Sequence, residues 1–154
     1  MSLEIIVQNA AQSDAVPKAE KIQNWVQHAL GESCSGELTV RVVGESEGVS
    51  LNERFRHGSG ATNVLAFPYV DTAPVSTLEF PSLGDLIICA PVLEREAADQ
   101  GKLLEAHWAH ISIHGTLHLL GYDHETAEDA RVMEAREREL LAALGFDDPY
   151  PEGV

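Results

Sequence analysis

Apolar residues in the first half of the chain follow the short period of extended strands. Residues 3–8 are mostly apolar, and polar and apolar positions alternate in residues 37–43, as in a strand with one buried face. Residues 62–67 favour a strand that stops at Pro68, and residues 85–89 (DLIIC) form a short apolar run suited to the centre of a sheet. This half therefore predicts a sheet of about four strands.

Helical patterns bounded by proline and glycine separate and follow these strands. Proline is favoured in the first turn of a helix and glycine just beyond its end. Thr126 is a suitable N-cap for the last helix, which reaches Leu144. Residues 69–83, with several prolines and small polar residues, predict an exposed loop. The other predicted helices span residues 17–30, 46–55, 91–100 and 103–120.

This order of elements predicts an α+β fold with a mixed sheet packed by helices, because strands dominate the first half and helices the second. The helix at 103–120 is apolar nearly all round, which is typical of a helix buried in the core. The chain has 154 residues, no internal repeat and no linker. We therefore expect one domain over residues 1–154, the size of an ordinary single domain.

Composition places the chain among globular proteins, with 44% hydrophobic and 23% charged residues. The first residues lack the basic and apolar stretches of a secretory signal. No apolar run approaches the roughly 20 residues that cross a bilayer. Cys34 and Cys89 lie outside any CxxC pattern and are expected to be reduced thiols. These features predict a cytoplasmic protein.

Charge limits the partners that the chain can attract. Ten Lys and Arg against 25 Asp and Glu give a net charge of −15. Proteins that bind nucleic acid usually carry a basic surface, so broad, sequence-independent affinity for RNA or DNA is not expected. The acidic segment 125–139 is interpreted as a solvated helix surface. A local cationic spot around Arg41, Arg54 and Arg56 stays open.

Histidines are concentrated on one predicted helix. His107, His110, His114 and His118 are spaced by three, four and four residues, so they lie along one side of it. A single histidine is most often an ordinary hydrogen-bonded residue, and we expect core positions with satisfied hydrogen bonds for His107 and His110. The remaining two belong to a more specific pattern.

His114, His118 and His124 form the motif HxxxHxxGxxH. Two histidines four residues apart on a helix can hold one ion, and Gly121 ends the helix with a reversal that brings the third histidine to it. Three protein ligands that leave a fourth position to water are typical of catalytic zinc. We expect one Zn²⁺ per chain, although three imidazoles also suit nickel, copper or iron.

The same spacing occurs in the metzincin peptidases, in which a glutamate after the first histidine is the general base. Gly115 stands at that position here. The ligands are present but the peptidase base is missing, so peptide hydrolysis by that route is not expected.

Further segments accompany the histidine motif. They are His114-Gly115-x-Leu117-His118-Leu119-x-Gly121-Tyr122-Asp123-His124, Leu83-Gly84-Asp85, and Asn52-x-x-Phe55-Arg56 followed by Thr62-x-Val64-Leu65-x-Phe67-Pro68. In these segments the chain closely resembles the YbeY family of bacterial metal-dependent endoribonucleases, over about residues 37–150. Ser59 and Ala61 stand where that family often has Asp and Pro, and Ala66 replaces a common Ser.

The resemblance implies a metal-dependent endoribonuclease specific for single-stranded RNA. It further implies a role in maturing the 3′ end of small-subunit ribosomal RNA and in ribosome quality control, with RNA, the ribosome and ribosome-associated proteins as partners. Its three histidines would bind zinc, and Arg56 would be catalytic, since a guanidinium fork pairs with two phosphate oxygens. The departures in sequence affect the 57–61 loop and leave the histidines intact.

Other assignments stay open. Asp123 is either a turn residue or a carboxylate that orients a ligand, and Asp85 begins a strand, where it is at least as well suited to capping a turn. The net charge of −15 favours a metallohydrolase with a substrate other than RNA. A ribosome-assembly factor without catalysis, in which zinc is structural, is a third hypothesis.

Overall fold

Four strands form one mixed sheet in the computed structural model, which describes residues 3–11, 13–32, 34–55, 60, 62–68 and 82–150. The strands lie in the order β1-β2-β4-β3, with β3 antiparallel to β4 at one edge and the other pairs parallel. They span Leu3–Asn9 (β1), Gly36–Val43 (β2), Val64–Pro68 (β3) and Ser82–Cys89 (β4). The predicted α+β fold with a mixed, four-stranded sheet is confirmed.

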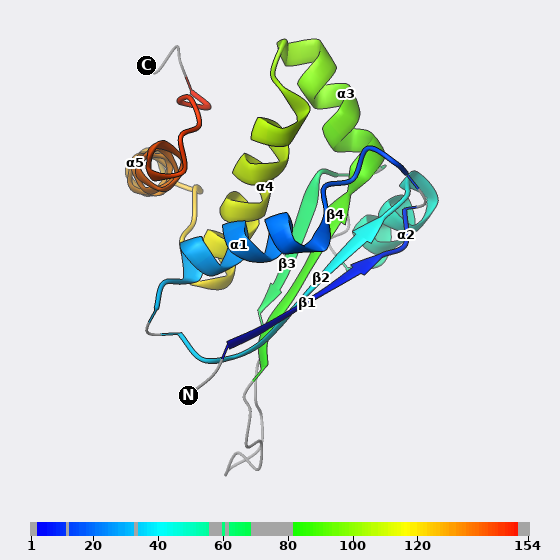
Figure 1. Cartoon of the computed structure of the whole chain (residues 1–154), viewed down its shortest axis with the longest axis horizontal. Helices are drawn as coiled ribbons and strands as arrows, with labels where there is room; N and C mark the ends of the chain where they lie inside the picture. Colours follow the sequence, from blue (N-terminus) through cyan, green and yellow to red (C-terminus); the bar gives the residue numbers. More distant parts are fainter. Residues whose placement is uncertain are drawn as a thin grey trace.

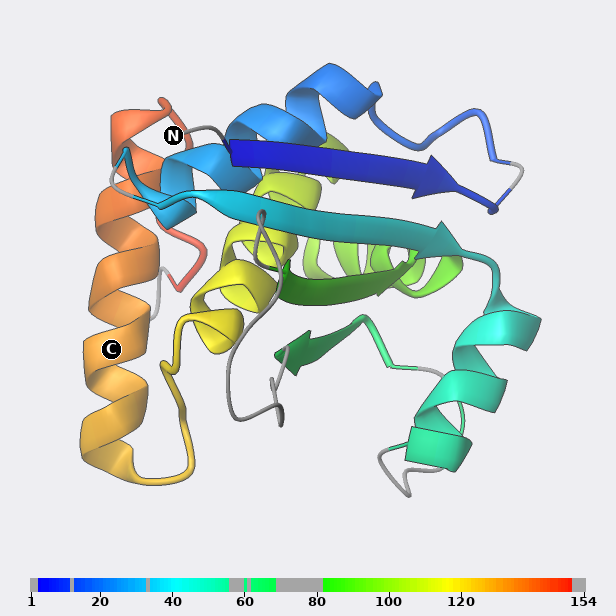
Figure 2. The same cartoon turned by 90° about the horizontal axis from the view of Figure 1, so that it is seen from below.

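Helices cover the two faces of this sheet unequally. Two of them, α1 and α4, lie over one face and α5 stands beside α4 (Figures 1 and 2). On the other face, Leu51 and Phe55 of α2 border a pocket with Thr39, Asp85 and Ile87 of the sheet. The helices span Ala19–Leu30 (α1), Glu45–Phe55 (α2), Ala90–Gln100 (α3), Leu104–Leu119 (α4) and Ala127–Ala143 (α5).

The core lies between the sheet and α1, α4 and α5. Leu38, Val40 and Val42 of β2 point into it and are fully buried, while the alternate residues Thr39 and Arg41 are only half-buried. Every residue of α4 from 107 to 117 is buried except His114. The prediction of a central buried helix is confirmed, and its last two turns bring His114 and His118 towards the surface.

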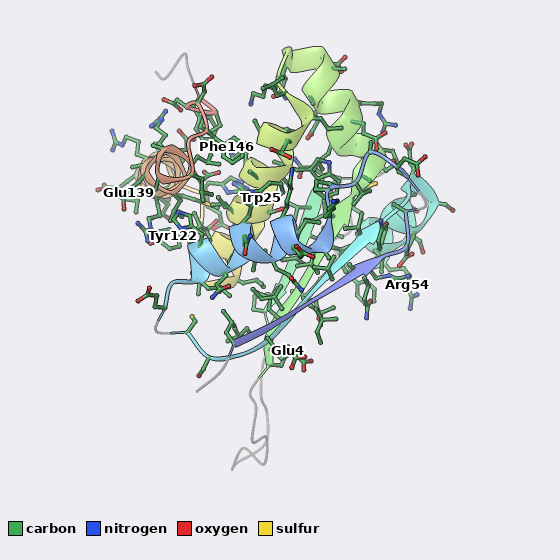
Figure 3. All side chains as sticks on the ribbon, viewed as in Figure 1. Glu4, Trp25, Arg54, Tyr122, Glu139 and Phe146 are labelled. Carbon is green, nitrogen blue, oxygen red and sulfur yellow. The ribbon has the colours of Figure 1, made fainter. Side chains whose placement is uncertain are left out.

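The segment after α5 returns across the helices. The ring of Phe146 meets the ring of Trp25 from α1 edge to face, with centroids 6.3 Å apart, and Figure 3 shows the two side by side. Further along, the ammonium of Lys102 donates to the carbonyl of Pro149. These contacts fix the path of the chain as far as Tyr150.

Several boundaries differ from the sequence-based expectation. β4 begins at Ser82, which pairs with Glu37 of β2, so the predicted loop ends too late. The rest of that loop, residues 69–81, lies outside the described residues. α1 begins at Ala19, so Pro17 precedes the helix instead of lying in its first turn.

Gly84 lies inside β4, at a position that requires a glycine. Its φ is +130°, and a Cβ there would lie 2.6 Å from the carbonyl oxygen of Phe67 and 3.0 Å from Leu119. Only glycine tolerates both this backbone conformation and the close approach of β3. The Leu83-Gly84-Asp85 segment therefore positions β3 against the end of α4.

Two predictions about composition can be compared with the structure. Cys34 and Cys89 are both free thiols, as expected. Among the described residues, none of the helices is long and apolar enough to span a bilayer.

Candidate metal centre

Three histidine side chains converge at the end of α4. One ring nitrogen from each of His114, His118 and His124 lies within 4.8 Å of the others. His114 and His118 come from consecutive turns of α4, and His124 comes from the loop before α5. The structure thus brings together all three residues of the HxxxHxxGxxH motif.

Gly121 makes this convergence possible. Its φ is +101°, its N–H donates to the carbonyl of His118 at 3.0 Å, and the N–H of Tyr122 donates to the carbonyl of Leu117 at 3.0 Å. This pair of bonds is the Schellman arrangement that ends a helix and reverses the chain. The predicted role of Gly121 is confirmed, and the reversal places His124 beside the two helical histidines.

Hydrogen bonds fix which nitrogen of each helical histidine carries a proton. Nδ1 of His118 lies 3.1 Å from the carbonyl oxygen of Tyr122. A carbonyl can only accept, so Nδ1 carries the proton and Nε2 keeps its lone pair. Nδ1 of His114 lies 2.9 Å from a carboxylate oxygen of Glu137, which leaves the same tautomer for His114.

The Nε2 atoms of the two rings face each other. They are 3.2 Å apart. The pKa of His118 is lowered by burial first, and then by His114 and His124, so at neutral pH its ring lacks a second proton. With His124, the two rings lie close enough together for one cation to be bound by all three rings. The donor set of neutral imidazoles fits a transition metal ion.

Glu137 of α5 is the main residue of the site that the sequence analysis missed. Its side chain is 0% exposed, and its carboxylate accepts from His110, His114 and the hydroxyl of Tyr150 at 2.7–3.1 Å. Burial alone would raise its pKa, but hydrogen bonds from His110 and His114 outweigh burial and lower the pKa to about 2. The interpretation of the whole 125–139 segment as a solvated surface is therefore wrong at this residue.

A signal for Glu137 exists in the sequence. Met133, Leu140 and Leu141 lie four residues before it and three and four residues after it, and all three are buried. Position 137 therefore belongs to the apolar face of α5. A carboxylate on such a face needs a partner, and the histidine stripe of α4 offers several.

His107 and His110 are buried, as expected, but only one nitrogen of each is paired. Nε2 of His107 bonds to Glu96 at 2.8 Å, and Nε2 of His110 bonds to Glu137. Nδ1 of both rings has no hydrogen-bond partner among the described residues. Burial, which outweighs the attraction of Glu96, lowers the pKa of His107 and keeps it neutral.

The sequence left the roles of Asp123 and Asp85 open, and the structure places them in a turn and in a strand. A carboxylate oxygen of Asp123 accepts from the backbone N–H of His124 at 2.7 Å, so Asp123 shapes the turn. Asp85 is exposed and lies inside β4 instead of at its beginning. It borders the pocket on the α2 side.

Of the three arginines of the cationic spot that the sequence left open, Arg41 forms an ion pair. Nε of Arg41 lies 2.6 Å from a carboxylate oxygen of Glu47, so its charge is neutralised. Arg56 lies outside the described residues. Asn52 precedes Arg56 in the sequence and Gly60 follows it. The buried side chain of Asn52 donates from Nδ2 to the carbonyl of Gly60 at 2.9 Å. This bond ties the end of α2 to the chain that leads into β3.

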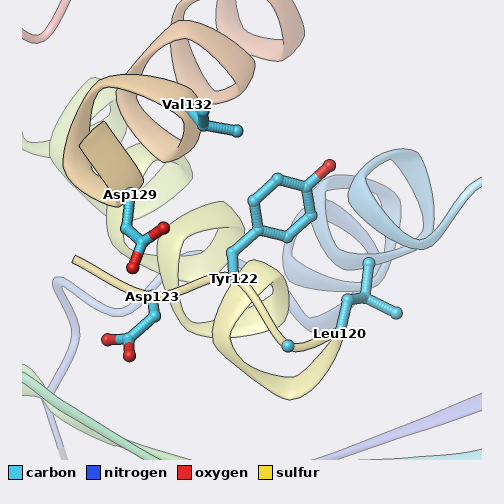
Figure 4. A pocket seen from close by; sticks show the side chains of 6 residues that line it. Leu120, Tyr122, Asp123, Asp129 and Val132 are labelled. Atoms are coloured by element: carbon cyan, nitrogen blue, oxygen red, sulfur yellow. The ribbon is translucent and has the colours of Figure 1, made fainter. Parts of the chain in front are cut away.

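Two hollows lie near the end of α4, and His118 lines one of them. One, of about 360 Å³, lies between His118 and β3 and is lined by Val64, Leu65, Ala66 and Pro68. The other, of about 500 Å³, lies at the turn before His124, where Figure 4 shows Tyr122 between Leu120 and Val132, with Asp123 and Asp129 nearby. The candidate site therefore borders a hollow through His118, on the side of β3.

Together the fold and the site define a class of protein: an α+β domain with three histidines that could hold a metal ion at the end of its buried helix. Comparison with known families agrees with the resemblance noted in the sequence. The family model described as Endoribonuclease YbeY matches residues 6–145. The chain belongs to the endoribonuclease YbeY family.

Curated relatives cover nearly the whole chain. An endoribonuclease YbeY of Pseudomonas putida strain F1 is 52% identical over 151 residues, which are 97% of this chain and 94% of the relative. The protein of the same name from Stutzerimonas stutzeri is 54% identical over 92% of this chain and 88% of the relative. The one from Nitrosococcus oceani is 48% identical over 97% and 98%.

A solved structure shares the fold. The solution structure of a Thermotoga maritima protein matches with a TM-score of 0.50 and 22% sequence identity, over 94% of this chain and 99% of that chain. At this identity the match concerns the fold alone.

Proposed function

We propose that the chain is a metal-dependent endoribonuclease that cleaves single-stranded RNA, with residues 1–154 forming one catalytic domain. The observation that carries this proposal is the pair of facing Nε2 atoms of His114 and His118, 3.2 Å apart, in a chain of the endoribonuclease YbeY family. Its ribosomal substrate would be the 3′ end of small-subunit rRNA, matured in the cytoplasm, and its partners the ribosome and ribosome-associated proteins. A role in ribosome quality control is proposed from the family resemblance.

The proposed cofactor is one Zn²⁺ per chain, held by His114, His118 and His124. Three neutral imidazoles with room for a further ligand are the donor set of catalytic zinc, and other transition metals accept the same set. When bound, such an ion lowers the pKa of water and stabilises negative charge that develops on a phosphodiester.

The chain's own residues would then bind and orient the RNA. We place the scissile segment in the hollow between His118 and β3, because it adjoins the ligand cluster and its lining from β3 lacks acidic residues. Arg56 is the proposed catalytic residue: its guanidinium would pair with phosphate oxygens and stabilise charge in the transition state. The bond from Asn52 to Gly60 holds the described residues on either side of Arg56 together.

The net charge of −15 favours one rival, a metallohydrolase with a substrate other than RNA. Long-range electrostatics repel a polyanion from such a surface. RNA binding would therefore depend on local positive charge, from the ion and from Arg56. Since screening weakens the repulsion, moderate salt should hinder this enzyme less than it hinders a basic nuclease.

A cleavage assay separates these functions. Purified protein is incubated with a labelled single-stranded RNA and with the same RNA annealed to its complement, with and without a chelator. We expect internal cleavage of the single strand, little cleavage of the duplex, and loss of activity in chelator that Zn²⁺ restores. Metal-loaded protein that leaves RNA intact would refute the proposal and favour the assembly factor or another substrate.

A further inference from the structure

The two helical ligands of the metal centre are held by different kinds of acceptor. Nδ1 of His118 donates to a backbone carbonyl of the same turn, which carries no net charge. Nδ1 of His114 donates to Glu137, a buried carboxylate from another helix. The orientation of His114 therefore depends on how α5 packs against α4, whereas that of His118 is set locally.

We propose that Glu137 is a positioning residue of the metal centre, which fixes the ring orientation and tautomer of His114 and is itself held by Tyr150. This inference rests on the proposed function, because it assumes that His114 binds metal. It concerns residues outside the three-histidine motif, in the last helix and in the segment that follows it.

Charge makes Glu137 more than a packing residue. A carboxylate that accepts from the far nitrogen of a ligand imidazole increases the electron density of the ring and strengthens its bond to a metal. Glu137 is 0% exposed, so water cannot compete for its oxygens. Its negative charge also offsets part of the positive charge of a bound ion. A neutral side chain of the same shape would lack both effects.

Three donors from two other parts of the chain satisfy the buried carboxylate. His110 and His114 belong to α4, and Tyr150 belongs to the segment after α5. The Tyr150 hydroxyl lies 3.1 Å and 3.0 Å from the two carboxylate oxygens. Burial, and then the charge of Glu137, raise the pKa of Tyr150, so the hydroxyl keeps its proton and donates.

Contacts of its own hold Tyr150 in place. Asp148 accepts from the backbone N–H of Tyr150 at 2.8 Å and pairs with Arg138 at 3.0 Å. The guanidinium of Arg138 lies over the Tyr150 ring, 5.3 Å from its centroid, and Lys102 bonds the carbonyl of Pro149. The C-terminal segment is thus fastened beside Glu137.

A second reading of the same residues is a second ion held by His110, His114 and Glu137, which also lie within 4.8 Å of one another. The hydrogen-bonded reading is preferred because His110, His114 and the Tyr150 hydroxyl already satisfy the carboxylate at ordinary hydrogen-bond distances. It predicts one ion per chain. Two tightly bound ions per chain would overturn the positioning role.

The test compares Glu137→Gln, Tyr150→Phe and the control Glu139→Gln with the parent chain. Glu139 is on the same helix with a side chain 70% exposed, so its variant makes the same change in charge without touching the site. The dissociation constant for Zn²⁺ is measured by competition with a chelator. We expect Glu137→Gln to bind Zn²⁺ about 10–100-fold more weakly, Tyr150→Phe to be weakened less, and Glu139→Gln to match the parent.

A second measurement reports the tautomer of His114 directly. Nitrogen-15 NMR of the metal-free parent should report His114 as the tautomer protonated at Nδ1, and Glu137→Gln should report a mixture of tautomers. A parent that binds no Zn²⁺ would refute the proposed function. A parent that binds Zn²⁺ while His114 is protonated at Nε2, or a folded Glu137→Gln variant with unchanged affinity, would refute the positioning role alone.

Discussion

Neighbouring imidazoles at the end of α4 face each other through nitrogen atoms that carry lone pairs. One ring nitrogen from each of His114, His118 and His124 lies within 4.8 Å of the others, so each of the three histidines should be needed for metal binding. We expect His118→Ala, like His114→Ala and His124→Ala, to lose the tightly bound ion while the fold is retained. Elemental analysis of the purified variants tests this. Full metal content in His118→Ala would remove it from the ligand set.

Metal binding should also depend on pH, because a protonated imidazole cannot be a ligand. The ordinary histidine pKa is 6.5, and burial lowers the pKa of His118 below it. A ring with a lowered pKa stays neutral further into the acid range. We therefore expect metal retention at neutral pH and release as the pH falls well below about 6.5.

Substitution of Arg56 should distinguish metal binding from RNA cleavage. If its guanidinium meets charge that grows on the phosphate, Arg56→Ala should keep metal and fold but reduce RNA cleavage by roughly 10²–10³-fold. Arg56→Lys should recover part of the loss, because an ammonium keeps the charge without the fork. RNA hydrolysis and metal content are measured on the same samples.

Arg54 provides the matched control for this experiment. It lies two residues earlier in the exposed last turn of α2, with its guanidinium 5.2 Å from the centroid of the Phe55 ring. Arg54→Ala makes the same change in net charge and should leave cleavage near the level of the parent. Near-normal cleavage by Arg56→Ala would exclude Arg56 from the mechanism, while equal losses in both variants would indicate a general charge effect.

Local spacing explains why the histidines could be predicted and Glu137 could not. His114, His118 and Gly121 lie within eight residues, and helix geometry alone brings them together. Glu137 reaches His114 only because α5 packs on α4, and no periodic pattern in the sequence predicts that packing. Asp123 is close in sequence to the ligands, yet it bonds a backbone N–H and no ligand ring.

Among the elements, α4 packs so closely on the sheet that position 115 has no room for a side chain. A Cβ on Gly115 would lie 2.9 Å from Val64 of β3 and 3.0 Å from Leu86 of β4. Gly115 therefore faces the sheet. A glutamate at this position, where the metzincins have their general base, would collide with the sheet. Overpacking of this kind costs about 1–3 kcal/mol, more than the roughly 1 kcal/mol that alanine gains over glycine within a helix.

We expect Gly115→Ala to be less stable than the parent in urea denaturation. Gly115→Glu should be destabilised further, because it forces a carboxylate against the buried face of the sheet, and it should not hydrolyse peptides although it restores HExxH. Gly44→Ala, at a position without a positive φ and with nothing within 4 Å of an added Cβ, is the control for glycine replacement without crowding. Robust peptide hydrolysis by Gly115→Glu would show that the substrate class has been misjudged.

The types of the elements could be predicted from the sequence. Helices and strands differ in the local period of their apolar residues, and glycine and proline mark where they begin or end. Thr126 caps α5 as expected, with its hydroxyl accepting from the N–H of Asp129 at 3.0 Å. Element ends depended on tertiary pairing. Ser82 joins β4 because Glu37 of β2 is its partner, and this partner lies 45 residues earlier in the sequence.

For the whole molecule, buried ionisable groups predict loss of stability in acid. His107 is buried and faces Glu96, His110 and Lys102, with the net result that its pKa lies below 6.5. The unfolded chain therefore binds a proton near pH 6.5 that the folded chain refuses, so stability falls as the pH drops below about 6.5. Glu137 adds a second loss between its ordinary pKa of 4.5 and its folded pKa of about 2.

Urea denaturation of metal-free protein at about pH 7.5 and about pH 5.5 measures the first effect. We expect a lower free energy of unfolding at the lower pH, and a smaller difference between the two in His107→Gln, which cannot take up the proton. A parent chain equally stable at both values would show that His107 is not held neutral by burial.

The central claim about the whole molecule is that RNA cleavage requires the ion held by the three histidines. Its most direct test is a titration of chelator-stripped protein with Zn²⁺, with bound metal and single-stranded RNA cleavage measured on the same samples. We expect no cleavage by the stripped protein, a rise in proportion to occupancy, and saturation at one ion per chain. Cleavage that persists undiminished after the metal is removed would contradict this claim.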